Sequence, residues 1–137
     1  MSVLVVGGTG FIGRRVIQLL LERGENTICM DINAGTASFV DAEGEYTFLR
    51  GDVTQFQDVV RAMLESKADR LLNLAYLLGG GHGDPHHTMR LNVLGMDNCF
   101  EAARLCGVRR VVYASSLAVS GAQSHFGDRK LTEDDPT

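Results

Sequence analysis

The sequence of 137 residues lacks tryptophan and has only two prolines, two lysines and three cysteines. No apolar run approaches the ~20 residues that cross a membrane. The short apolar run near the N-terminus has neither the basic stretch nor the cleavage site of a secretory leader. These absences predict a cytoplasmic protein without a membrane segment.

Basic clusters are also missing, because the net charge is -4 and the arginines gather only in pairs. A nucleic-acid footprint needs basic residues collected on one face, so nucleic acid is not an expected partner. The cysteines, Cys29, Cys99 and Cys106, form no C-x-x-C pair and lie in apolar patterns. We interpret them as packed free thiols rather than disulfides or metal ligands.

What the sequence has is an alternation of short apolar runs and amphipathic stretches, with 45% hydrophobic and 22% charged residues. The apolar runs at 2–6, 26–31, 46–52, 70–75 and 108–116 predict strands covered on both faces. Helical stripes are formed by Ile12, Val16, Leu19 and Leu20, by Phe56, Val59, Val60, Met63 and Leu64, and by Val93, Met96, Phe100 and Ala103. Residues 33–45 have no stripe and predict a loop or a short, poor helix. The pattern predicts an α/β fold with a doubly wound parallel sheet and a ligand at the carboxyl ends of its strands.

The turn "GGTGFIG", between the first strand and the first helix, fits both G-x-G-x-x-G from Gly8 and G-x-x-G-x-x-G from Gly7. Glycine allows a tight turn and close approach of a pyrophosphate to the helix amides. Asp31 follows Gly13 by 18 residues, where a carboxylate accepts the ribose hydroxyls of an adenosine. The following "INA" offers no cation for a 2′-phosphate, which favours NAD over NADP. The structural alternatives are a plain tight turn for the glycines and a capping or solvated carboxylate for Asp31.

Five segments then resemble the extended short-chain dehydrogenase/reductase family, the NAD-dependent epimerases and dehydratases: "GGTGFIG", "GDVTQ", "LNLA", "NVLGMDNCFEAA" and "VVYASSLAVSG". The resemblance implies a Rossmann-type NAD-binding domain over residues 1–137 and a small-molecule substrate, commonly a sugar or nucleotide sugar. It also implies a homodimer built on the fourth and fifth helices of the full-length enzyme.

The resemblance implies these cofactor-binding residues: Gly7, Gly10, Phe11, Ile12, Gly13, Asp31, Asp52, Val53, Leu74, Ala75 and Asn92. Asp52 and Val53 are expected beside the adenine, and Leu74 and Ala75 on the nicotinamide side. Asn92 is expected to hold the fourth helix and a proton-relay water.

Ser116 is the implied catalytic serine, which hydrogen-bonds the reacting substrate oxygen. Its place five residues before Gly121 selects it over Ser115. A hydroxyl that caps the backbone at the strand end is the alternative. The sequence departs from the family pattern at Asn73, Tyr76, Met96 and Ser120.

The loop "GGGHGDPHHT" carries His82, Asp84, His86 and His87. No histidine pair has a clear i, i+4 spacing, so we expect a polar substrate-side loop here rather than a metal site.

The family's Tyr-x-x-x-Lys pair, in which the lysine lowers the tyrosine pKa for proton transfer, is missing from these residues. The three tyrosines are followed four residues later by Arg50, Gly80 and Leu117. We therefore interpret the chain as the cofactor half of an NAD-dependent epimerase, dehydratase or dehydrogenase, truncated after the fifth strand and inactive alone. The catalytic helix and the C-terminal substrate domain are expected to lie beyond it. The alternative is a non-catalytic NAD-binding or regulatory module.

Overall fold

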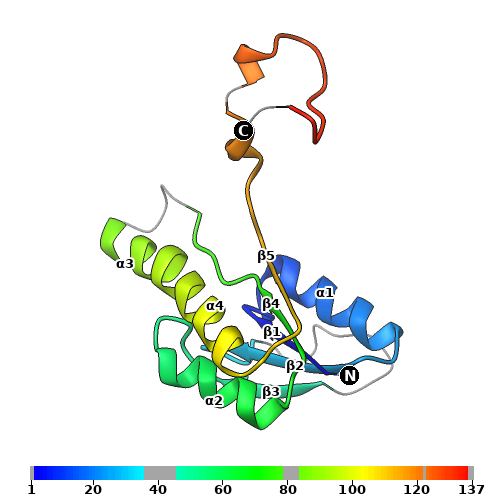
Figure 1. Ribbon diagram of the computed structural model, residues 1–137, viewed down its shortest axis with the longest axis vertical. Helices are drawn as coiled ribbons and strands as arrows, with labels where there is room; N and C mark the ends of the chain where they lie inside the picture. Colours follow the sequence, from blue (N-terminus) through cyan, green and yellow to red (C-terminus); the bar gives the residue numbers. More distant parts are fainter. Residues whose placement is uncertain (1, 36–45, 79–83, 122, 136–137) are drawn as a thin grey trace.

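The computed structural model describes residues 2–35, 46–78, 84–121 and 123–135 (Figure 1). In these residues five parallel strands form one sheet: β1 (Ser2–Val6), β2 (Asn26–Asp31), β3 (Thr47–Arg50), β4 (Arg70–Asn73) and β5 (Arg110–Tyr113). Their order is β3-β2-β1-β4-β5, so the chain winds outward from β1 on one side and then returns to the other. This confirms the predicted doubly wound parallel sheet, whose switch point lies between β1 and β4.

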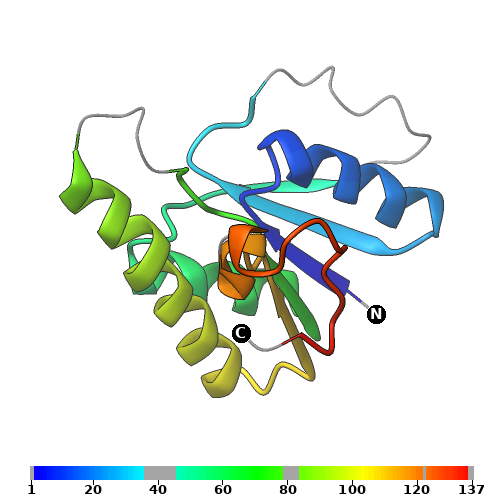
Figure 2. The same ribbon diagram turned by 90° about the horizontal axis from the view of Figure 1, so that it is seen from above.

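Helices cover both faces of the sheet, with α1 (Phe11–Glu22) on one face and α2 (Phe56–Ser66) and α4 (Gly95–Leu105) on the other (Figures 1 and 2). A short helix, α3 (Pro85–Met89), continues through a π-helical turn (Arg90–Leu94) into α4. Beyond β5, two 3-10 turns (Leu117–Ser120 and Gln123–His125) stand away from the sheet. Among the described helices, none combines the length and apolar character of a membrane span.

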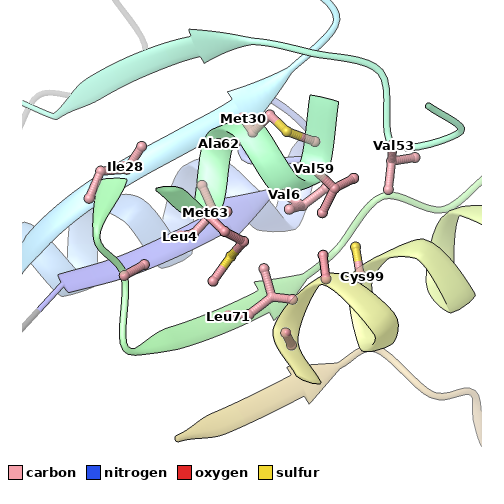
Figure 3. Close-up of a cluster of buried hydrophobic side chains, with 13 residues drawn as sticks. Leu4, Val6, Ile28, Met30, Val53, Val59, Ala62, Met63, Leu71 and Cys99 are labelled. Carbon is pink, nitrogen blue, oxygen red and sulfur yellow. The ribbon is translucent and has the colours of Figure 1, made fainter. Parts of the chain in front are cut away.

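Alternation along β1 divides the core into two parts, because successive side chains of a strand point to opposite faces. Val3 and Val5 pack with Ile17 of α1, whereas Leu4 and Val6 face α2 and α4. Figure 3 shows the second part, in which strand residues meet Val59, Ala62 and Met63 of α2 and Cys99 of α4. The pattern of continuous apolar strands therefore follows from burial on both faces.

The helices lie where the sequence predicts them, and the predicted stripes are buried in part: Val59, Met63 and Ala103 are buried. Ile12 is 59% exposed and Leu64 is 65% exposed, and Leu19, Val93 and Phe100 are exposed as well. Buried helix positions outside the predicted stripes include the small residues Gly13, Ala62 and Ala102, together with the larger Ile17. Small residues let a helix approach the sheet closely, so they take the contact and leave neighbouring large side chains outside.

The stretch predicted as a loop at 33–45 has no regular structure at 33–35, and its remaining residues lie outside the described ranges. The polar loop predicted at 79–88 is described only from Asp84 onward. There it is helical rather than irregular, because the Asp84 side chain caps α3 by accepting a hydrogen bond from the His86 amide (2.9 Å). The helical run therefore begins earlier than the apolar stripe indicated.

Charged side chains tie the amino ends of the strands together, on the edge opposite the predicted ligand site. Arg70 makes a bidentate pair with Glu25 (2.6 and 3.0 Å), and this hydrogen bonding lowers the pKa of Glu25. Asp69 accepts a hydrogen bond from the Ser2 amide (3.1 Å) and pairs with Arg109 (3.3 Å). The network joins the amino ends of β1, β4 and β5, and the predicted ligand site lies at the opposite edge of the sheet.

All three cysteines are free thiols. Cys29 and Cys99 are buried, and burial raises the pKa of both thiols to about 12. A thiol with such a pKa is protonated and unreactive near neutral pH, so these two side chains serve as packing groups.

Candidate functional site

A cavity of about 240 Å³ opens at the carboxyl edge of the sheet, beside the switch point between β1 and β4. Predicted site residues that line it are Gly7, Gly10, Asp31, Asp52, Val53, Leu74 and Ala75. The strand ends thus bring residues from four separate segments to one place. Phe11, Ile12, Gly13, Asn92 and Ser116 do not line this cavity.

The glycine turn is packed too tightly for side chains at several positions. Gly7 has a φ of +76°, and a Cβ there would lie 2.6 Å from the Ala75 backbone nitrogen. A Cβ on Gly8 would lie 2.5 Å from the Cys29 sulfur, and one on Gly13 would collide with the Gly7 carbonyl. A Cβ on Gly10, which lines the cavity, would lie 3.2 Å from the Gly7 oxygen. The turn is therefore held by its neighbours and offers bare backbone to a ligand.

The first turn of α1 supplies backbone donors next to this turn. Gly10 caps the helix without a side chain, and the amide of Arg14 donates to the Gly10 carbonyl (3.1 Å) as the first bond of the helix. The amides of Phe11, Ile12 and Gly13 precede that bond, where a helix has no internal acceptor. Such amides, with the positive end of the helix dipole, favour an anion such as a pyrophosphate. Phe11 is 89% exposed and does not line the cavity, so the group of Phe11 next to the glycine turn is its backbone amide.

Asp31 holds the glycine turn as well as facing the cavity. One carboxylate oxygen accepts hydrogen bonds from the Thr9 amide (3.1 Å) and the Thr9 hydroxyl (2.7 Å), and the other accepts from the Ile32 amide (2.8 Å). A carboxylate has about four acceptor positions, which leaves room for a ligand hydroxyl. Sequence reasoning found Asp31 and missed Thr9, whose only signal was its place inside the glycine motif.

Beyond β3, the loop at Asp52 and Val53 is fixed by helix side chains. The Asp52 amide donates to Asp58 (2.9 Å), and the Asp52 side chain accepts from the Thr54 amide (2.8 Å). The buried side chain of Asn98, in α4, donates to the Val53 carbonyl (2.9 Å). Asn98 therefore holds Val53 in the cavity wall through this hydrogen bond, although Asn98 itself does not line the cavity.

The segment after β4 is clamped by two asparagines. The Ala75 amide donates to the Asn73 side chain (3.0 Å). Asn92, in the π-helical turn, accepts from the Leu77 amide and donates to the Leu77 carbonyl, both at 2.8 Å. Asn92 thus positions the cavity wall rather than lining it, and Asn73 has a matching role that the sequence did not reveal.

Ser116 lies beyond β5, is exposed, and accepts a hydrogen bond from the Ala118 amide (3.2 Å). The capping alternative describes this geometry, and a catalytic role for Ser116 stays a prediction. Asp84 caps α3, and His86 and His87 lie within this helix. His82 falls outside the described ranges. Among described residues, no group of three potential ligands could hold a metal ion.

The sequence profile of the NAD dependent epimerase/dehydratase family matches residues 3–137. The chain belongs to this family. Its members depend on NAD, so the predicted cofactor is confirmed at the level of the family. The glycine turn, the α1 amides and Asp31 form a donor and acceptor set that suits a dinucleotide.

Two relatives of known name resemble the chain along most of its length. A 3-beta-hydroxysteroid dehydrogenase from Mycolicibacterium neoaurum is 34% identical, with 94% of this chain and 36% of the relative covered. A UDP-glucose 4-epimerase from Mycolicibacterium smegmatis is 31% identical, with 85% and 39% covered.

Solved structures agree with this assignment. The UDP-glucose 4-epimerase of Thermus thermophilus in complex with NAD has a TM-score of 0.81 and 32% identity, with 99% of this chain and 44% of that chain covered. A Stenotrophomonas UDP-glucose-4-epimerase with bound NAD and formylated UDP-arabinopyranose has a TM-score of 0.81 and 28% identity, with 91% and 40% covered. The chain therefore spans about two fifths of the length of such proteins.

Proposed function

We propose that this chain holds NAD as the cofactor-binding part of an epimerase, dehydratase or dehydrogenase acting on an alcohol carbon of a sugar or nucleotide sugar. One observation carries the proposal: the glycine turn and the carboxylate of Asp31 line one cavity, and the first amides of α1 directly follow that turn in the chain. When bound, NAD supplies a nicotinamide ring that accepts and returns hydride. The UDP-glucose 4-epimerases among the relatives support a nucleotide sugar as the substrate.

Each side of the site has a separate task in this proposal. The amides of Phe11, Ile12 and Gly13 bind the pyrophosphate, and Asp31 accepts hydrogen bonds from the adenosine ribose. Asp52 and Val53 border the adenine, while Leu74 and Ala75 line the opposite end. Ser116 is proposed to hydrogen-bond the substrate oxygen. We also propose the cytoplasm as the location, because a reducing compartment keeps three cysteines as free thiols.

The 137-residue chain is expected to bind NAD but to show no turnover. It has the binding groups, yet none of its tyrosines is followed by lysine at the fourth position, so the usual proton-transfer pair is lacking. Titration calorimetry with NAD measures the first property. Conversion of UDP-glucose to its C4 epimer, and NADH absorbance with a 3-beta-hydroxysteroid, measure the second, because an epimerase returns the hydride and accumulates no NADH. A chain that fails to bind NAD contradicts the proposed cofactor role, and robust turnover contradicts the assigned chemistry.

The protein from its native source distinguishes the enzyme assignment from the non-catalytic alternative. If that protein continues into a Tyr-x-x-x-Lys segment and interconverts an alcohol substrate, the enzyme assignment holds. If it binds NAD, ends without the pair and processes none of the substrates, the regulatory-module alternative replaces it.

We further propose that the whole protein is a homodimer with α4 at its interface. The helical run 85–105 leaves large apolar side chains exposed, namely Met89, Val93, Leu94, Phe100 and Leu105. Exposed apolar side chains gathered on one helical run favour packing against another helix. Sedimentation of the whole protein is expected to show a dimer. Val93→Glu is expected to shift the protein toward monomer. Leu64→Glu in α2 is the matched control, because Leu64 is also exposed and lies outside this helical run. A strictly monomeric wild-type protein contradicts this proposal.

A further inference from the structure

Tyr76 occupies a fixed position in the cavity wall after β4. Its neighbours on both sides are held through their backbones, Ala75 by the Asn73 side chain and Leu77 by the Asn92 side chain. Tyr76 itself lines the cavity and is 57% exposed. An aromatic residue therefore lines the cavity between two neighbours whose backbones are hydrogen-bonded to asparagine side chains.

The order of the strands decides which part of a dinucleotide this ring can meet. The glycine turn follows β1, Asp31 follows β2 on one side of it, and Tyr76 follows β4 on the other side. With the pyrophosphate at the turn and the adenosine at Asp31, the remaining half of the cofactor extends toward β4. That half ends in the nicotinamide ring.

The two redox states of nicotinamide differ in ways that an aromatic side chain can sense. In NAD⁺ the ring is a planar, aromatic cation, and in NADH it is neutral and no longer aromatic. A tyrosine face attracts a cation through its quadrupole and stacks best on a flat aromatic ring. Both effects act on NAD⁺ and are weaker for NADH.

We propose that Tyr76 is a specificity-determining residue that contacts the nicotinamide ring and biases the site toward the oxidised cofactor. This inference rests on the proposed NAD site and adds one residue to it. The phenol hydroxyl has no part in the contact, so phenylalanine can replace tyrosine.

The test compares three ligands that share one adenosine and one pyrophosphate. Affinities for NAD⁺, NADH and ADP-ribose, which lacks nicotinamide, are measured by calorimetry on the wild-type chain and on Tyr76→Leu. Tyr76→Leu is expected to weaken NAD⁺ by about 3- to 10-fold and NADH by less, and to leave ADP-ribose within about 2-fold. Tyr76→Phe is expected to keep the wild-type affinities.

Tyr113→Leu is the matched control, because Tyr113 is also about half exposed but lies on β5, in edge contact with Phe100 at 5.3 Å. It is expected to change none of the affinity ratios. An unchanged ratio of NAD⁺ to ADP-ribose affinity in Tyr76→Leu overturns the inference, and so does an equal loss for all three ligands. Failure of the wild-type chain to bind ADP-ribose or NAD⁺ instead contradicts the proposed cofactor site itself.

Discussion

Gly7→Ala is expected to lower the free energy of unfolding by about 2 to 5 kcal/mol. Two costs add at this position. A side chain at a φ of +76° is strained by ~1 to 2 kcal/mol, and the new Cβ would lie 2.6 Å from the Ala75 backbone nitrogen. Forcing atoms into a packed region costs a further ~1 to 3 kcal/mol. Urea unfolding followed by circular dichroism measures the sum.

Gly24→Ala provides the matched control, because Gly24 also has a positive φ, of +68°, but a Cβ there meets nothing within 4 Å. It carries the strain without the collision, so its loss is expected to be only ~1 to 2 kcal/mol. Equal losses for the two variants would show that the turn is not held against the end of β4. The difference between them isolates the contact that shapes the cavity.

Asp31→Ala is expected to weaken NAD binding by roughly 10- to 150-fold. Hydrogen bonds to a charged group contribute ~1.5 to 3 kcal/mol, and the variant removes the acceptor proposed for the ribose hydroxyls. The variant also removes both bonds that hold Thr9. Calorimetry with NAD measures the loss, and NADP tests its cause. The wild-type chain is expected to prefer NAD, because a 2′-phosphate would meet the Asp31 carboxylate, and Asp31→Ala is expected to narrow that preference.

Thr9→Val separates the two roles of Asp31. It deletes the 2.7 Å hydroxyl bond and keeps the carboxylate for a ligand, so a loss of only ~2- to 10-fold is expected. If Thr9→Val reproduces the whole effect of Asp31→Ala, the carboxylate acts through the turn and not on the ribose. Equal affinity of the wild-type chain for NAD and NADP contradicts the assignment of Asp31 directly.

Local patterns were enough to predict the strands, the glycine turn and the place of Asp31, because each depends on residues close together in the chain. The strand at 26–31 is an apolar run, and the turn is a motif of seven residues. The contacts that shape the site are of another kind. Asn92 reaches Leu77 across 15 residues, and Asn98 reaches Val53 across 45. The periodicity of apolar residues in the sequence does not indicate such hydrogen bonds between side chain and backbone, so only the folded structure shows them.

The orientation of the helices shows the same limit. The apolar stripe of α1 is broad, and sequence alone does not say which part of it meets the sheet. Gly13 settles the question, because close contact with the turn brings Ile17 inward and leaves Ile12 exposed. Ser116 is a different case, since its proposed role depends on a substrate and its hydroxyl is seen here in a capping bond.

The central place of β1 has a consequence for how this protein is made on the ribosome. Val3 of β1 pairs with Arg70 of β4, so one edge of β1 has no partner until the chain has been synthesised past residue 73. At ~5 to 20 residues per second, that interval lasts roughly 3 to 13 seconds. An unpaired apolar strand is a template for association with other chains. The strand that ends in the glycine turn is thus exposed to misassembly for several seconds of its own translation.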